Sequence, residues 1–150
     1  MAWLAARGVR DAGLVGRAMA GEPLPEMILC SPARRTRETL TEILAALPNG
    51  PKVEIVDALY DSRGATYATT IARHGGDADR ILVIGHNPTV HATAVALAAL
   101  PGAKLAAKFP TCALAVLAFD TATWAGIDAG GGRLVSFRRP RDLGALDADD

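Results

Sequence analysis

Two short stretches of the sequence place anion-binding side chains directly after apolar runs. Ser31 follows the run "MILC" and precedes Arg34, Arg35 and Arg37, whereas His86 follows the run "ILVIG". Guanidinium groups make charge-assisted hydrogen bonds to phosphate oxygens, and an imidazole can donate a hydrogen bond or carry charge near neutral pH. These residue types favour a site for an anion, most simply a phosphoryl group.

Both stretches have the pattern of a strand that runs directly into a helix. Ser31 and Asn87 belong to the residue types preferred at the helix N-cap, and Pro32 and Pro88 follow where proline fits the first helical position. We therefore expect two helix N-termini, with free N–H groups and positive dipole ends, to point at the carboxyl edge of a sheet. Open α/β sheets bind ligands at that edge.

The three arginines of the first stretch cannot all serve one site. With Ser31 as helix cap, Arg34 and Arg35 point in different directions from the helix axis. We expect one arginine to face the site and the others to lie in solvent or beside Glu38 and Glu42. The helical periodicity alone leaves open which arginine that is.

The elements that would position these residues alternate along the chain. This alternation predicts an α/β fold, a three-layer sandwich with a mostly parallel sheet and helices on both faces. The last two strands are expected to form an antiparallel hairpin. Strands are predicted over 26–31, 52–59, 80–86, 111–120 and 133–138, and helices over 7–20, 31–47, 65–76 and 87–100. Residues 144–150 are expected to be a mobile tail of a single domain.

Length and composition limit the functional classes. The chain has 150 residues and a formal net charge of zero, which disfavours a general binder of nucleic acid or membrane surface. No apolar stretch reaches membrane-spanning length, and the two cysteines suggest no disulfide framework, so we expect a cytoplasmic protein. We expect no metal and no cofactor, because His91 lies off the helical face of His86. The oligomeric state stays open.

Five segments together resemble the histidine phosphatase, or phosphoglycerate mutase-like, superfamily, and more narrowly its SixA-type phosphohistidine phosphatases. They are "LCSPARRTRETL", "VEIVDALYD", "ILVIGHNPTV", "KFPTCALAVLAFD" and "RLVSFRRPRDL", and the similarity extends from about residue 4 to residue 143. Within them, "SPARRTRET" matches the family's Ser-Pro-x-x-Arg-x-x-x-Thr segment, which makes Arg35 the equivalent of its pocket arginine. Likewise "GHNP" matches the second catalytic histidine, here His86.

The resemblance implies hydrolysis of a phosphoryl group on a protein histidine, through a phosphohistidine intermediate formed on a first histidine. Arg35 and His86 would hold the phosphoryl oxygens, and Ser31 and Asn87 would organise the two helix ends around the substrate. The implied partner is a phosphorylated protein histidine or a small phosphomonoester. No metal is needed, because cationic side chains neutralise the charge.

The sequence departs from the family pattern at its start. The family's Arg-His-Gly motif ends its first strand, whereas this chain begins with Met1-Ala2-Trp3, already at the stretch that follows the motif. We therefore expect the first strand, which would lie between the "ILCS" and "LVIGH" strands, to be missing together with the nucleophilic histidine. A misassigned gene start, a partial gene or a real loss would each explain this. The 150-residue chain should then have little or no phosphatase activity.

Other features of the sequence leave alternatives to this function. The triplet Arg73-His74-Gly75 copies the missing motif, but it follows a helix and would lie at the amino end of the next strand. A cysteine phosphatase needs arginine at the sixth position after the nucleophile, and Thr36 occupies that position after Cys30. A phosphate-binding or regulatory remnant without catalysis, and a phosphomonoesterase acting on small molecules, remain open.

Overall fold

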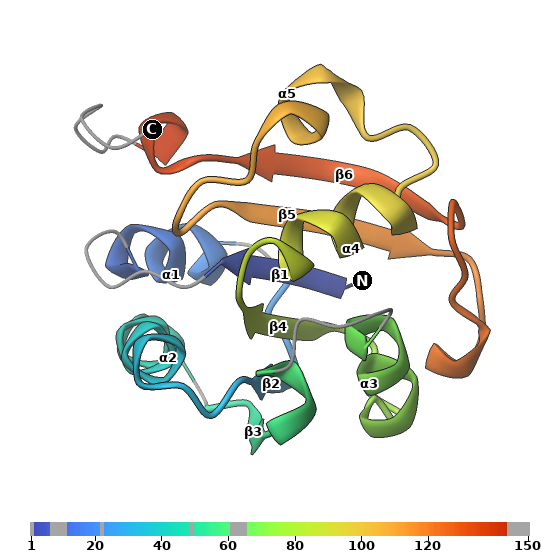
Figure 1. Ribbon diagram of the computed structural model, residues 1–150. Coiled ribbons are helices and arrows are strands. Elements are labelled where there is room, and N and C mark those ends of the chain that lie inside the picture. Colours follow the sequence, from blue (N-terminus) through green and yellow to red (C-terminus); the bar gives the residue numbers. More distant parts are fainter. Residues whose placement is uncertain (1, 7–11, 22, 49, 61–65, 144–150) are drawn as a thin grey trace.

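The chain folds into a six-stranded sheet with helices on both faces (Figure 1). The computed structural model describes residues 2–6, 12–21, 23–48, 50–60 and 66–143. The strands are β1 (Ala2–Ala6), β2 (Met27–Cys30), β3 (Lys52–Ile55), β4 (Ile81–Gly85), β5 (Leu114–Phe119) and β6 (Gly132–Arg138). The helices are α1 (Ala12–Ala20), α2 (Arg34–Ala46), α3 (Thr66–His74), α4 (Thr89–Leu97) and α5 (Gly102–Ala107). The predicted α/β architecture is confirmed.

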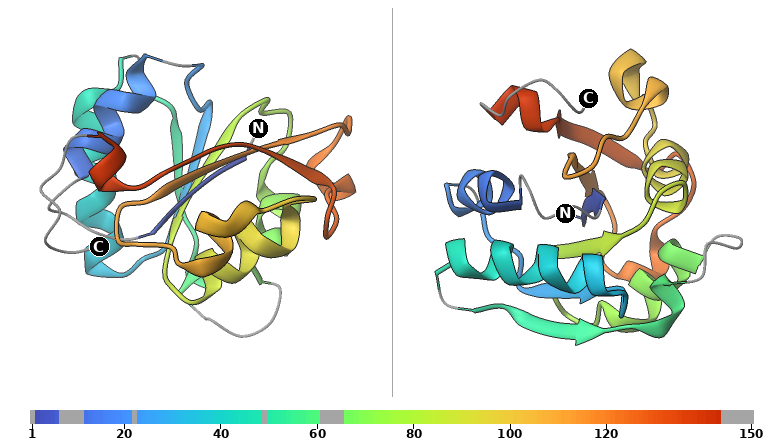
Figure 2. Two further views of the ribbon diagram at one scale, coloured as in Figure 1. Left: turned by 90° about the horizontal axis from the view of Figure 1, so that it is seen from above. Right: turned by 60° about the vertical axis from the view of Figure 1, so that its left-hand side comes forward.

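Strands β2 and β4 are buried at every residue, which explains their unbroken apolar runs. Along β4 the side chains alternate: Val83 packs with α3 and α4, whereas Leu82 and Ile84 pack with α1 and α2. Figure 2 shows these two helix layers on opposite sides of the sheet. The residues of β4 therefore contribute alternately to two apolar cores, one on each face of the sheet.

The strand order is β3-β2-β4-β1-β5-β6, with β1 in the interior of the sheet. β1 pairs parallel to β4, where Ala6 lies opposite Gly85, and antiparallel to β5, where Ala5 lies opposite Leu114. Residues 2–6 thus form an interior strand, whereas the loss of the family's own first strand with its Arg-His-Gly motif stays a prediction. The place expected for that first strand is wrong, because β2 pairs directly with β4 and leaves no gap between them.

The last two strands form the predicted antiparallel hairpin, with Leu114 opposite Arg138. Two other elements differ from expectation. The strand predicted over 52–59 ends at Ile55 and continues as a 3-10 turn over Asp57–Leu59, and the short helix α5 was not predicted. The predicted first helix is described from Ala12 onward, and the predicted tail at 144–150 lies outside the described residues.

The four parallel strands, β1 to β4, bring their carboxyl ends to one edge of the sheet. Cys30 lies opposite Ile84, so that Ser31 and His86 leave the sheet next to each other. β1 ends beside them, because Ala6 is opposite Gly85. This edge holds the candidate site.

Candidate functional site

Ser31 and His86 meet at the carboxyl edge, although 55 residues separate them in the sequence. The Ser31 Oγ and His86 Nε2 atoms are 2.7 Å apart, a short hydrogen bond between side chains. The Ser31 side chain is fully buried, and the imidazole is partly exposed. The serine therefore fixes one ring nitrogen of a histidine whose ring still reaches the surface.

The predicted capping role of Ser31 is wrong. Helix α2 begins at Arg34, and its N-cap is Ala33, which makes no side-chain cap hydrogen bond. The Ser31 hydroxyl instead accepts a hydrogen bond from the Ala33 N–H at 3.3 Å and bonds His86. The helix starts later than predicted, so Pro32 is not at its first position.

Asn87 and Pro88 likewise differ from prediction. The N-cap of α4 is Pro88, with no side-chain cap hydrogen bond, and the helix starts at Thr89. Asn87 donates from Nδ2 to the carbonyl oxygen of Phe109 at 2.7 Å. Its side chain therefore connects the segment after His86 to the segment that enters β5. In this position it does not cap α4.

Tyr67, near the start of α3, fixes the backbone of His86 through a hydrogen bond. Its hydroxyl accepts a hydrogen bond from the His86 N–H at 2.9 Å and donates to the carbonyl oxygen of Leu59 at 2.9 Å. Burial raises the pKa of this phenol, and the hydrogen bond from His86 opposes the rise. A Cβ atom at Gly85 would lie 2.3 Å from the Tyr67 hydroxyl oxygen, so only glycine permits this contact.

Tyr60 adds an aromatic edge to the site. Its ring centroid lies 5.8 Å from that of His86, with the planes 75° apart. The Tyr60 side chain is largely exposed, so it forms an outer wall beside the imidazole. Neither tyrosine was predicted from the sequence, although Gly85 before His86 signals a close approach at the end of a strand.

The three arginines at the start of α2 lie in different surroundings. Arg34 lies 3.9 Å from Glu38 and is 88% exposed, as expected for an arginine in solvent beside an acidic neighbour. Arg37 acts on the pKa of Cys30 through its charge. Arg35 is exposed in the first turn of α2, at the carboxyl edge. Its convergence with His86 on one oxyanion remains a prediction.

Cys30 has the environment of a structural thiol. It is fully buried, and desolvation raises its pKa to about 11, against the lowering effects of the Thr36 hydrogen bond and of Arg37. The thiolate is the nucleophilic form of cysteine. At neutral pH this side chain is therefore an unreactive thiol, which disfavours the cysteine phosphatase alternative on chemical grounds as well as on register.

The other two histidines lie away from the site. His74, at the end of α3, places Nδ1 3.1 Å from Glu54 Oε2 on the edge strand β3. His91 places Nε2 2.6 Å from the carbonyl oxygen of Leu105. Across the described ranges, no cluster of three or more His, Cys, Asp or Glu side chains could hold a metal ion.

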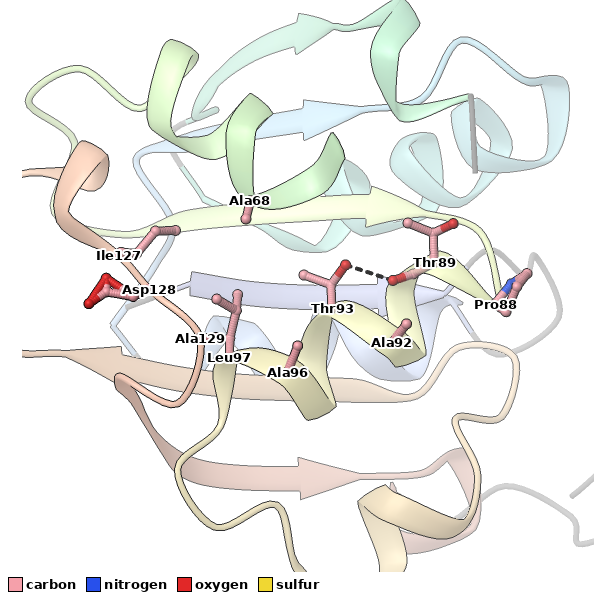
Figure 3. A pocket seen from close by; sticks show the side chains of 10 residues that line it. All are labelled: Ala68, Pro88, Thr89, Ala92, Thr93, Ala96, Leu97, Ile127, Asp128 and Ala129. Atoms are coloured by element: carbon pink, nitrogen blue, oxygen red, sulfur yellow. Dashed lines mark hydrogen bonds between the residues drawn. The ribbon is translucent and has the colours of Figure 1, made fainter. Parts of the chain in front are cut away.

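A groove of about 400 Å³ lies beside α4 (Figure 3), but it is not the anion site. Its wall is mostly alanine, threonine and branched aliphatic side chains, and it contains neither Ser31, His86 nor any arginine. The lining residues are Ala68, Pro88, Thr89, Ala92, Thr93, Ala96, Leu97, Ile127, Asp128 and Ala129.

No helix among the described residues is both long enough and apolar enough to span a bilayer.

Comparison with known proteins identifies relatives of this chain. The family model of the histidine phosphatase superfamily (branch 1) matches residues 2–67. An uncharacterized protein of Mycobacterium tuberculosis is 36% identical over 145 residues, which cover 92% of this chain and 89% of the relative. The chain belongs to the histidine phosphatase superfamily. An uncharacterized protein of Mycobacterium leprae is 33% identical over 144 residues, covering 92% of this chain and 86% of that protein.

Solved structures agree with this assignment. A structure described as the phosphohistidine phosphatase SixA of Nakamurella multipartitia is 27% identical, with a TM-score of 0.79, over 93% of this chain and 95% of that chain. One described as SixA of Agrobacterium tumefaciens is 29% identical, with a TM-score of 0.71, over 92% and 97%. The resemblance to SixA-type phosphatases is confirmed, and the family identifies the chain as a phosphatase-type hydrolase.

Proposed function

We propose that the carboxyl edge beside Ser31 and His86 is the phosphoryl-binding site of a SixA-type phosphatase that acts on phosphohistidine in proteins. The observation that carries the proposal is the position of His86. It follows β4 at the ligand edge, and it is held by Ser31 through the ring and by Tyr67 through the backbone. A side chain fixed in this way loses little freedom when it binds a ligand.

The roles of the residues follow from their chemistry. The guanidinium of Arg35 would bind two phosphoryl oxygens, and the imidazole of His86 would bond a third and stabilise the charge developed during transfer. The hydroxyl of Ser31 and the amide of Asn87 keep the two strand ends in place. The surface location of the imidazole suits a phosphoryl group presented by another protein, because no deep cavity must be entered.

We further propose that the 150-residue chain binds a phosphoryl group without rapid turnover. The residues after β1 are Arg7 and Gly8, where the family has His-Gly after an arginine. Of the three histidines, His74 pairs with Glu54 and His91 bonds a backbone carbonyl, so neither is placed to act as the nucleophile. Binding without catalysis is the alternative function that this departure favours.

Hydrolysis of a protein phosphorylated on histidine tests these statements. The native chain should release phosphate no faster than its His86→Ala variant. The double substitution Ala6→Arg with Arg7→His creates the sequence Arg-His-Gly at the end of β1. This variant should hydrolyse the phosphoprotein, and a further His86→Ala substitution should abolish that turnover. Turnover by the native chain that depends on His86 would contradict the statement that the nucleophile is missing. If the double variant gained no turnover, the placement of that nucleophile at the end of β1 would be wrong.

A further inference from the structure

An exposed aromatic ring, that of Tyr60, lies beside the phosphoryl site. In the part of the chain that the structure describes, four large hydrophobic side chains are exposed, and the other three are aliphatic: Ile55, Leu100 and Val135. Single exposed hydrophobic side chains are normal on a protein surface. Tyr60 differs because its ring contacts His86, with the centroids 5.8 Å apart and the planes at 75°. The residue is 65% exposed, so a ligand can reach its ring.

The backbone that carries Tyr60 is connected to His86 through one buried hydroxyl group. Tyr60 follows the 3-10 turn Asp57–Leu59, and its N–H donates to the first carbonyl oxygen of that turn at 3.0 Å. Leu59 is fully buried, and its carbonyl oxygen accepts a hydrogen bond from the Tyr67 hydroxyl at 2.9 Å. The same hydroxyl accepts the hydrogen bond from the His86 N–H, also at 2.9 Å. A buried side chain therefore sets the position of Tyr60 relative to His86.

A phosphohistidine would bring a further aromatic ring to this place. Its imidazole is bonded directly to phosphorus, so a phosphoryl group bound at His86 carries the substrate ring into the surroundings of the site. Aromatic rings attract each other in offset or edge-to-face pairs with centroids about 4.5–7 Å apart. A protonated imidazole gains further from the face of a tyrosine ring. A phosphoserine or an aliphatic phosphomonoester has no ring and gains neither interaction.

We propose that Tyr60 is a specificity-determining residue that binds the imidazole ring of the substrate's phosphohistidine. The inference rests on the proposed function, because it requires the phosphoryl group to be bound beside His86. Tyr60 then selects phosphohistidine over phosphoserine, whereas affinity for a bare oxyanion does not depend on it. The interaction uses the ring of Tyr60 and does not require its hydroxyl.

Calorimetric titration with two peptides of one sequence and with tungstate tests this role. One peptide carries phosphoryl-triazolylalanine, a stable aromatic mimic of phosphohistidine, and the other carries phosphoserine at the same position. Tyr60→Ala should weaken binding of the aromatic mimic roughly 2- to 12-fold and leave binding of the phosphoserine peptide and of tungstate unchanged. Tyr60→Phe keeps the ring and should bind all three as the native chain does.

The matched control is Leu100→Ala, which removes an exposed hydrophobic side chain three residues beyond the other end of α4 from His86. This variant should bind all three ligands with native affinity. Exposed substitutions of this kind leave the fold intact, which thermal melting verifies.

Three results would overturn the inference. They are native affinity of Tyr60→Ala for the aromatic mimic, an equal loss of affinity for the phosphoserine peptide, and a loss in Tyr60→Phe as large as in Tyr60→Ala. Tungstate keeps the inference distinct from the proposed function. If the native chain bound no tungstate, the phosphoryl site and this inference would both be wrong. If tungstate binding were intact and Tyr60→Ala bound the aromatic mimic normally, the inference alone would be wrong.

Discussion

Replacing Tyr67 by phenylalanine removes one hydroxyl and breaks both of its hydrogen bonds at the site. The ring is 1% exposed, so the His86 N–H and the Leu59 carbonyl would lose their partner in a largely buried place. An unsatisfied buried backbone group costs about 1–3 kcal/mol, so the pair should lower the free energy of unfolding by about 2–6 kcal/mol. In a domain of this length that corresponds to a fall in Tm of roughly 4–24 °C.

Urea denaturation followed by circular dichroism measures this effect, and the m-value should stay unchanged. The matched control is Tyr60→Phe, because Tyr60 is 65% exposed and touches His86 through its ring. That control should change stability by less than about 0.5 kcal/mol. If Tyr67→Phe cost no more than Tyr60→Phe, the statement that the Tyr67 hydroxyl fixes the His86 backbone would be wrong.

Four further predictions use stability and binding as measurements. Gly85→Ala should destabilise the chain by several times the effect of Gly50→Ala in thermal melts, because an added Cβ at Gly50 meets nothing within 4 Å. The raised pKa of Cys30 predicts stability that is constant below about pH 9 and falls by up to about 3 kcal/mol as pH rises to about 11, a loss that Cys30→Ala should lack. Ser31→Ala should weaken tungstate binding in calorimetry, whereas Ser31→Thr, which keeps the hydroxyl, should recover part of it. His74→Gln should leave tungstate binding unchanged, and a fall would make His74 part of the site.

The strands and most helices were predictable because their signals are local. β4 is apolar at every position, and α2 repeats its buried residues at helical spacing, as at Leu40 and Ile43. The position of β1 was not predictable, since "AWLAA" has no strand-specific pattern of its own. Its pairing with β4 and β5 is decided by residues far along the chain.

The site was predictable in its chemistry and less so in its geometry. The sequence indicated that Ser31 and His86 both follow strands at the carboxyl edge of the sheet, but a serine after a strand is an equally good helix cap. The Ser31 hydroxyl instead bonds His86, 55 residues away in the sequence. No local sequence pattern predicts a contact between residues so far apart. Tyr67 was missed for the same reason, because its hydroxyl acts at a distance of 19 residues from His86.

Calorimetric titration with tungstate, a tetrahedral oxyanion like phosphate, tests most directly whether Arg35 and His86 bind one shared anion. Hydrogen bonds to charged groups contribute about 1.5–3 kcal/mol, so Arg35→Ala and His86→Ala should each weaken binding about 10- to 100-fold. Arg34→Ala, in the same helical turn but 88% exposed and beside Glu38, should bind as the native chain does. Native-like affinity in Arg35→Ala, or an equal loss in Arg34→Ala, would contradict the account.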